Sequence, residues 1–518
     1  MGCRPARGSA FRASAVVVCL QLTAVLTALA WLPGCRSAAD TPATAARTVR
    51  AGFAVPAASV QSLVQDFIDV FASERLYLLG DDGRPSPRLA ERWSVSADGL
   101  RWTFVVHQGL KYHDGSAATA FALKDSIERA LRDQSAGPTR SDVAAISADD
   151  DRTLVVSLRR RSSLLLDMLQ GVSLMRNAAN RQIGTGPFMV ESSTPELTVM
   201  RAFKEYYQGP PSIDRLELRV FPTVRAAWAA MMRDEIDVLF EVGRDAVEFV
   251  EAESSVEVHS FTRPWIFVLW FNMRNPAFAR QEVRQALSLA IDREAIVRSA
   301  LRGRGRAAEG YVWPSHWAYD RSAPSYQFDP ERARRLLDEA GFPLKTEDGR
   351  TRRLKLTCLI PSGVAPFEAM ALVAQRQLFD VGIDLEVQAT PYPSLVDRLE
   401  KGDYDTFMFQ MASQRTLIMP YQFLHSPAPG SRALLDSGYR AADGALDRVH
   451  AAGSDDEVRA AVSGLQRILY DDPPGVFIAW DERARAVSRR FVVPSTPGRD
   501  ILSTFWQVRP AAGASGSN

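Results

Sequence analysis

One segment of this chain, residues 184–240, contains several turn and strand signals in close succession, and it constrains the fold more than any other feature. In order, it shows a Gly-Pro turn, a short strand, a Gly-Pro-Pro turn, an alternating strand, a helix and an apolar strand, at residues 186–187, 188–190, 209–211, 216–221, 224–233 and 236–240. None of these residues forms a catalytic motif. The segment therefore predicts an α/β arrangement and leaves its function open.

The amino acids of this segment also follow a known pattern. Gly-Thr-Gly-Pro-Phe at 184–188, the Tyr-x-x-Gly-x-Pro-x-Ile-Asp turn at 206–214 and Glu-Ile-Asp at 235–237 resemble the central signature of family 5 of the extracytoplasmic solute-binding proteins. These are the peptide and oligopeptide receptors of ABC importers. Further blocks before and after this segment also resemble the family and occur in the same order as in the family, at 87–93, 96–100, 112–115, 271–272, 283–287, 290–293, 329–333, 336–341 and 381–384.

The resemblance implies an α/β, two-lobed periplasmic-binding-protein fold with mixed sheets, an extra subdomain and a hinge between the lobes. The chain is expected to cross between lobes near Asn272 and again near Glu482. The implied parts are lobe 1 at 47–58, 181–272 and 483–509, its subdomain at 59–180, lobe 2 at 273–482 and a disordered tail at 510–518.

The N-terminus has the layout of a secretory signal peptide at 1–34. Three arginines precede an uncharged stretch at 13–32, and Cys35 follows Leu-Pro-Gly. This ending resembles a lipoprotein cleavage box, in which Cys35 would receive the lipid and the small polar residues 36–46 would form a tether. An uncleaved transmembrane anchor is the alternative, because the apolar run approaches the ~20 residues that a bilayer requires. Both interpretations place the mature chain outside the cytoplasm, in the periplasm or at the cell surface.

The net charge argues against nucleic-acid binding, and the cysteine count argues against disulfides. The net charge of +1 gives no electrostatic basis for binding nucleic acid. Of the four cysteines, two lie in the signal peptide, Cys35 is assigned to the lipid, and Cys358 stands alone in an apolar run. We therefore expect no disulfide in the mature chain, a buried Cys358 and a monomer.

Hydrophobic periodicity predicts strands and helices throughout the rest of the chain. Strands are expected at 101–106, 153–158, 196–201, 216–221, 266–271, 354–359, 384–389 and 477–479. Helices are expected at 119–132, 224–233, 281–292, 293–302, 330–340, 365–379, 392–401, 444–452 and 455–470.

Motifs for catalysis and for metals are missing from the sequence. None of the six histidines stands in a His-Glu-x-x-His pattern, and the sequence contains no Gly-x-Ser-x-Gly elbow or phosphate-binding loop. The Gly-x-Gly run at 303–308 follows a helix rather than a strand, so we interpret it as a surface loop. We expect no enzyme activity, no cofactor and no metal site.

Candidate ligand-binding residues lie at the ends of the strands that cross between the lobes. A binding cleft requires apolar walls with a few convergent polar groups. Strand alternation predicts that Trp265 and Phe267 lie on one face and Trp270 on the other. The resemblance adds Phe240 and Glu241, which follow the Glu-Ile-Asp turn. Packing in the core is the alternative for each of these residues.

The stretch after residue 409 departs from the family pattern. Peptide binders of the family carry a Trp and then an Asp there, and this Asp neutralises the α-ammonium of the peptide. The present chain has no carboxylate at 410–417 and carries Gln414 and Arg415 instead. A buried ammonium without a counter-charge is costly. We therefore do not expect unmodified dipeptides or tripeptides to be the ligand, and Arg415 either pairs with an anionic group or faces solvent.

These features favour a lipid-anchored solute receptor that captures a peptide or related small solute between two lobes and delivers it to an ABC permease in the membrane. The alternative is a sensory or scaffolding lipoprotein that retains the binding fold without transporting a cargo. A secreted hydrolase is disfavoured, because no nucleophile and base are paired in the sequence.

Overall fold

The computed structural model describes residues 47–54, 60–132, 140–178, 181–347, 349–427 and 436–512. The expected signal peptide, Cys35 and the whole of the expected tether lie outside these ranges, as do residues 513–518 of the expected tail. Pro510, also assigned to the tail, belongs to the short strand β25 (Arg509–Pro510), which pairs with β24 (Phe491–Val492). In the described ranges, no helix combines the length and apolar character needed to cross a membrane.

In the described part of the chain, one mixed sheet of eleven strands connects the two lobes. Lobe 1 contributes, in spatial order, β12 (Phe188–Ser193), β13 (Leu197–Ala202), β14 (Arg215–Phe221), β1 (Thr48–Ala54) and β15 (Val238–Leu239). Lobe 2 contributes β22 (Thr406–Ala412), β20 (Leu354–Pro361) and β21 (Ile383–Thr390). Two long central strands lie between these halves, β23 (Gly475–Ser488) and β16 (Val256–Phe271), and the short strand β17 (Gly305–Ala307) pairs with β23.

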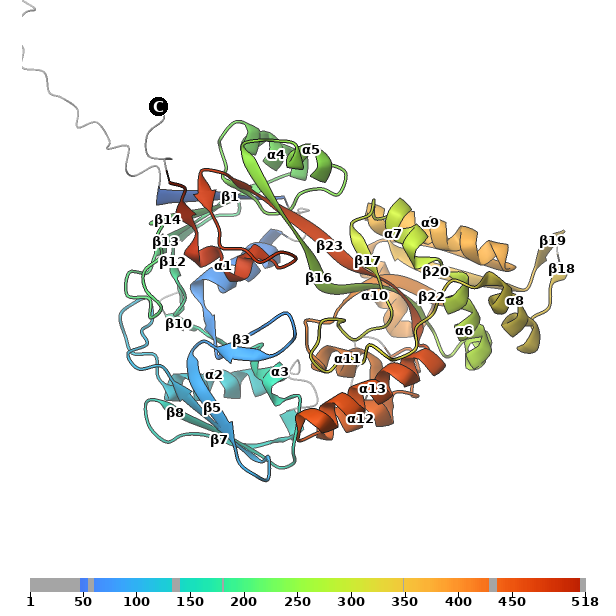
Figure 1. The fold of residues 1–518 in the computed structure, drawn as a ribbon, viewed down its shortest axis with the longest axis horizontal. Helices are drawn as coiled ribbons and strands as arrows, with labels where there is room; N and C mark the ends of the chain where they lie inside the picture. The colour runs from blue at the N-terminus through green and yellow to red at the C-terminus, as the bar shows by residue number, and fades with distance from the viewer. Residues whose placement is uncertain are drawn as a thin grey trace, which may run out of the picture. The chain divides into compact units, whose positions relative to one another are not determined.

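The two long strands run antiparallel through the middle of the fold and change neighbours partway along (Figure 1). Their pairing is interrupted between Thr262 and Ile266, around Pro264, which has no N–H to donate to a ladder. Strand β16 pairs with β22 from Trp265 onward, whereas the far end of β23 pairs with β15. We therefore place the first crossing between the lobes near Pro264, earlier than Asn272, and the second near Asp481.

Lobe 1 packs around a cluster of apolar side chains that includes Phe53, Phe188 and Leu216. Helix α1 (Val60–Ala72) joins this core rather than the subdomain, because Phe71 packs edge-on against Phe188 at 6.2 Å between ring centroids. Helices α4 (Val224–Met232) and α5 (Val247–Glu251) form a second cluster beside it.

Lobe 2 has a core on each face of its part of the sheet. Phe267, Leu269 and Phe271 of β16 face one core, and Ile266, Val268 and Trp270 face the other, as strand alternation requires. The first core is covered by α6 (Gln281–Ala290), α7 (Arg293–Ser299), α8 (Pro330–Glu339) and α9 (Ala365–Asp380). The second is covered by α10 (Tyr392–Lys401), α12 (Asp443–Ala451) and α13 (Asp455–Asp471), with α11 (Ile418–Leu424) alongside.

The subdomain is built on a four-stranded antiparallel sheet with helices packed beside it. The strand order is β5 (Ala90–Val95), β6 (Arg101–Val106), β8 (Thr153–Leu158) and β7 (Val143–Ala148). Its core also takes side chains from α2 (Ala120–Arg132) and α3 (Leu165–Leu169). Short elements complete the fold: β2 (Glu74–Arg75), β3 (Tyr77–Leu79), β4 (Pro85–Pro87), β9 (Ser173–Leu174), β10 (Arg176–Ala178), β11 (Arg181–Ile183), β18 (Lys345–Glu347), β19 (Arg350–Arg352), η4 (Pro276–Ala279), η5 (Ile501–Ser503) and η6 (Phe505–Gln507).

The expected helices and strands are all present. Most boundaries agree within two residues, and α10, β6 and β8 have the bounds that periodicity predicted. The two central strands are much longer than expected. Helices α1, α3, α5 and α11 were not predicted, nor were many of the strands, among them β1, β5 and β7. Cys358 is fully buried and is a free thiol, as expected.

The subdomain and lobe 2 contact each other directly. Leu164 of the subdomain packs into a lobe 2 core, and Ile418 of lobe 2 packs into the subdomain core. The carboxylate of Asp167 accepts hydrogen bonds from the backbone N–H groups of Leu417 and Ile418, at 2.7 and 3.1 Å. Apolar and polar contacts thus both connect the subdomain to lobe 2 in this structure.

The Asp167 contact predicts that the stability of the folded protein depends on pH. Burial raises the pKa of Asp167 to about 7, although the two N–H donors oppose this rise. A raised pKa means that the stabilising contribution is complete below the ordinary aspartate value and is lost as pH rises through about 7. We expect the free energy of unfolding to fall by ~2–4 kcal/mol between pH 5 and 8 through this group.

Asp167→Asn keeps a carbonyl oxygen for both N–H groups and removes the charge. Denaturant midpoints measured across this pH range should therefore diverge, with the variant the more stable at pH 8. Other titrating groups are common to both proteins and cancel in the difference. Parallel pH curves would show that Asp167 does not titrate in this range.

Candidate functional site

The crossing between the lobes brings Pro264 of β16 next to the loop that follows β22, although the two are distant in the sequence. The carbonyl oxygen of Pro264 accepts hydrogen bonds from the backbone N–H groups of Ser413 and Gln414, at 2.8 and 3.2 Å. Gln414 and Arg415 both adopt positive φ angles, of 53° and 59°. Such a conformation costs each non-glycine residue on the order of 1 kcal/mol or more and is concentrated at functional sites. The loop after β22 is therefore held in an unfavourable backbone conformation next to the crossing.

A buried carboxylate lies at the centre of the crossing. Asp481 of β23 is fully buried and forms ion pairs with three arginines: Arg244, Arg483 at 2.7 Å and Arg263 at 3.7 Å. Arg483 also pairs with Glu241. The three guanidinium groups come from the loop after β15, from β16 and from β23, so this cluster ties together both central strands and lobe 1.

The protonation states of the cluster follow from this arrangement. Burial by itself raises the pKa of Asp481, but the neighbouring guanidinium groups outweigh it and leave the pKa below the ordinary value. Burial lowers the pKa of Arg244 and of Arg263, but a guanidinium group in a protein is effectively always protonated near neutral pH. The cluster is therefore fully ionised under ordinary conditions.

A second carboxylate links the subdomain to both lobes. Asp81, in the loop after β3, pairs with Arg415 of lobe 2 at 2.9 Å and with Arg499 of lobe 1 at 2.7 Å. The indole N–H of Trp313 donates to the Asp81 backbone oxygen at 2.8 Å. Arg415 was expected either to pair with an anionic group or to face solvent, and in the structure it pairs with Asp81.

Several hydrogen-bond donors at the crossing have no acceptor. Within the described ranges, Arg244 Nε, Arg415 Nε, Gln410 Nε2 and Ser413 Oγ are buried and have no hydrogen-bond partner. Buried polar groups in native proteins are almost always paired, so each such atom requires an explanation. Three of these residues are connected to the crossing by hydrogen bonds or ion pairs: Arg244 pairs with Asp481, Arg415 pairs with Asp81, and the backbone N–H of Ser413 donates to Pro264.

Most of the sequence-predicted binding residues lie around this cluster. Trp265 is half-buried, with the guanidinium of Arg263 over its ring at 5.0 Å. Phe240 is half-buried under the guanidinium of Arg485 at 3.7 Å. Glu241 pairs with Arg483, and Gln414 is exposed beside Arg415.

Phe267 and Trp270 lie in the interior of lobe 2. Each is only 2% exposed. Phe267 packs edge-on against Phe367, and Trp270 stacks on Phe407 with ring centroids 6.4 Å apart. The sequence left packing in the core open for both residues, and their burial supports that interpretation.

Sequence reasoning missed the charged residues of the crossing: Asp81, Arg244, Arg263, Asp481, Arg483 and Arg499. A signal was present for some of them. Asp481 and Arg483 flank Glu482, the expected second crossing, and Arg263 stands two residues before Trp265. These charges directly follow the predicted strand at 477–479 and indicate ion pairing, but most of their partners come from elsewhere in the chain.

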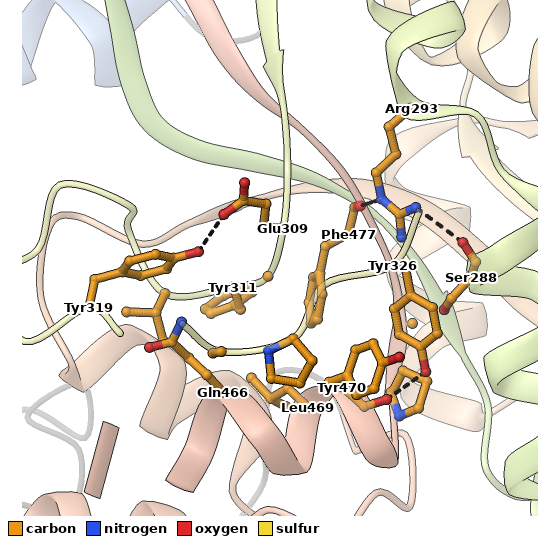
Figure 2. A pocket seen from close by; sticks show the side chains of 16 residues that line it. Ser288, Arg293, Glu309, Tyr311, Tyr319, Tyr326, Gln466, Leu469, Tyr470 and Phe477 are labelled. Carbon is orange, nitrogen blue, oxygen red and sulfur yellow. Dashed lines mark hydrogen bonds between the residues drawn. The ribbon is translucent and has the colours of Figure 1, made fainter. Parts of the chain in front are cut away.

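A separate small cavity lies inside lobe 2, lined by tyrosines and by Arg293 (Figure 2). Its volume of about 20 Å³ has room for about one water molecule. Arg293 donates to the backbone oxygens of Phe477 and Ser288 at 2.7 and 3.1 Å, and burial lowers its pKa to about 10. This cavity is too small for a solute, and Arg293 acts there as a structural cross-link.

No metal centre competes with this assignment in the described part of the chain, where no group of three or more His, Cys, Asp or Glu side chains is placed to hold an ion. Two lobes joined by a pair of central strands, with a charged cluster at the crossing, define a two-lobed solute-binding protein.

Comparison with known proteins identifies the family. Residues 84–429 match the model of the bacterial extracellular solute-binding proteins, family 5, so the chain belongs to this family. It is a binding receptor and not an enzyme. The expectation from the sequence motifs is thereby confirmed.

Two curated relatives show the range of similarity. The chain is 24% identical over 416 residues to the probable D,D-dipeptide-binding periplasmic protein DdpA of Escherichia coli (strain K12), covering 75% of this chain and 78% of the relative. It is 26% identical over 377 residues to the probable di/tripeptide-binding protein 5 of Pseudomonas aeruginosa, covering 65% of this chain and 70% of the relative.

Solved structures of similar fold cover most of the chain. NikZ from Campylobacter jejuni, in complex with Ni(L-His), has a TM-score of 0.76 and 20% identity, covering 89% of this chain and 99% of NikZ. AgaA from Agrobacterium tumefaciens R10, in complex with agropinic acid, has a TM-score of 0.72 and 22% identity, covering 90% and 99%. These similarities confirm the predicted two-lobed α/β fold.

Proposed function

We propose that this chain captures a peptide or related small solute between its two lobes and delivers it to the membrane permease of an ABC importer. The observation that carries the proposal is the pair of ion-pair groups at the crossing, centred on Asp481 and on Asp81, which together include side chains of lobe 1, lobe 2 and the subdomain. Relatives named as dipeptide-binding proteins and a neighbour crystallised with agropinic acid support capture of a small organic solute.

Closure about the two central strands provides the mechanism. A solute that contacts both lobes only in the closed arrangement shifts the equilibrium toward that arrangement. We assign the contacts to Trp265, Phe240, Glu241, Gln414 and Arg415, which surround the crossing. Phe267 and Trp270 support β16 from within the core. ATP hydrolysis belongs to the partner proteins.

Native mass spectrometry of the protein isolated directly from cells tests this function. A bound solute of defined mass, released on denaturation, is the expected result. Protein that carries no solute, together with small-angle scattering that is insensitive to extracts of the growth medium, would contradict solute capture.

We further propose that Cys35 is lipidated and anchors the protein to a membrane, with the lobes in the periplasm or at the cell surface. Support comes from the basic start, the uncharged stretch and the Leu-Pro-Gly-Cys ending of the first 35 residues. Cys35→Ser should abolish labelling by a radioactive or clickable fatty acid, whereas Cys358→Ser should leave it unchanged. Labelling that persists in Cys35→Ser would contradict the anchor.

A sensory or scaffolding lipoprotein is the second candidate. The observation that favours it is the absence of a carboxylate at 410–417, where peptide transporters of the family are expected to carry one. Deletion of the gene distinguishes the two roles. A transport receptor should be required for uptake of the solute that co-purifies, whereas a sensor should leave uptake intact.

A further inference from the structure

The charges at the crossing do not balance within the protein. The ion pairs centred on Asp481 and Asp81 join five guanidinium groups, those of Arg244, Arg263, Arg415, Arg483 and Arg499, to three carboxylates, those of Asp81, Glu241 and Asp481. Of the neighbouring ion pairs, Arg485 with Asp500 is balanced, whereas Arg304 lies between two carboxylates, Glu251 and Glu482, and so offsets one of the two surplus positive charges. The crossing therefore has an excess of positive charge in a partly buried location.

We propose that the solute held at the crossing is a net anion, whose carboxylate groups accept hydrogen bonds from Arg415 and Arg244. This inference rests on the proposed function and names the chemical class of its solute. A carboxylate is acceptor-only, and its planar pair of oxygens matches the fork of a guanidinium group.

The unpaired donors point to the same class. Arg244 Nε and Arg415 Nε belong to guanidinium groups that already have one carboxylate partner each, so each retains a free donor. Gln410 Nε2 and Ser413 Oγ add two neutral donors on the lobe 2 side. A buried donor without an acceptor costs ~1–3 kcal/mol, and a solute rich in acceptors would remove this cost.

A cationic solute does not fit the same site. Each of the three carboxylates already accepts from at least one guanidinium group, and Asp481 is paired with three. An ammonium group beside these carboxylates would add a further cation to a group of charges in which cations already outnumber anions. The local charges thus select against solutes with a free ammonium group as well as for carboxylates.

The placement of the two arginines also explains how an anion would favour closure. Arg244 follows β15 in lobe 1, and Arg415 follows β22 in lobe 2. A carboxylate-bearing solute that contacts both guanidinium groups would attract each of them, and it could make both contacts only when the lobes are closed. The anion therefore has a higher affinity for the closed arrangement than for the open one.

Citrate serves as a defined probe. Isothermal calorimetry at constant ionic strength should show saturable binding of citrate to the wild-type protein. Arg415→Gln should weaken this binding about tenfold or more, since it removes a charge-assisted hydrogen bond. The variant should fold, because Asp81 retains Arg499. Arg376→Gln, which removes an exposed cation on α9, is the matched control and should bind citrate like the wild type.

Each outcome decides the proposal. Absence of saturable citrate binding, or equal binding by wild type and Arg415→Gln, overturns it. Native mass spectrometry separates this failure from failure of the proposed function. If the solute released from cell-derived protein is neutral or cationic, solute capture stands and the anionic assignment falls. If a polycarboxylate or other acidic solute is released and Arg415→Gln protein lacks it, both stand.

Discussion

Replacing Asp481 by asparagine lowers the free energy of unfolding by ~3–5 kcal/mol, the scale measured when one partner of a buried ion pair is removed. The carboxylate is fully buried, and Arg244, Arg263 and Arg483 converge on it. Asparagine has a similar shape, so the loss reflects the charge and not a cavity. Three guanidinium groups would remain together with Glu241 as their nearby counter-charge.

Urea unfolding of the wild type and of Asp481→Asn measures this effect. Asp456→Asn is the control, because Asp456 is almost fully exposed and its pair with Arg459 should contribute at most ~1 kcal/mol. Equal losses in the two variants would show that the cluster does not stabilise the closed structure.

The same substitution should change the response to acid. The pKa of Asp481 is lowered in the folded protein, so its contribution is present above the ordinary aspartate pKa and is lost as pH falls through the folded-state value. The wild type should therefore lose stability on strong acidification, and Asp481→Asn should lose less over the same interval.

Alanine at Trp270 and alanine at Trp265 should have opposite consequences. Trp270 is buried between Phe407, Tyr311 and Phe477, so Trp270→Ala should cost ~3–5 kcal/mol of folding stability. Trp265 is half-buried beside Arg263 at the crossing. Trp265→Ala should leave stability nearly unchanged and weaken solute binding by ~1–3 kcal/mol.

Unfolding and calorimetry on the same two variants separate pocket from core. The calorimetry uses the solute identified from cell-derived protein. Trp270→Phe keeps an aromatic ring at this position. It should recover most of the stability that Trp270→Ala loses, which distinguishes a packing effect from misfolding. Normal solute binding by Trp265→Ala would remove Trp265 from the site, and a large loss of stability in that variant would place it in the core.

Local sequence patterns predicted most of the elements because their causes are local. Asp329 caps α8 through its side chain, and Pro330 occupies the first turn of that helix, as their residue types indicate. The alternation in β16 predicted that Phe267 and Trp270 lie on opposite faces. These properties depend on residues within a few positions of one another.

Other features escaped prediction because tertiary contacts decide them. Strands β16 and β23 contain charged residues at 481–485 and a proline at 264, which interrupt an apolar pattern, yet each strand stabilises the other through a long ladder of hydrogen bonds. For the same reason, the sequence could not predict that Trp270 is buried and Trp265 is only half-buried. Both residues belong to β16, and this strand runs from the crossing into the lobe 2 core within five residues.

By itself, the sequence determined the family, the α/β class and most of the longer helices, because motifs and periodicity are encoded by neighbouring residues. The tertiary structure alone decided which charges meet at the crossing. Arg244 and Asp481 are 237 residues apart in the chain, and no local pattern records such a pairing. Electrostatic energy depends on distance in space and on burial, so the excess of guanidinium groups that we assign to an anionic solute exists only in the folded protein.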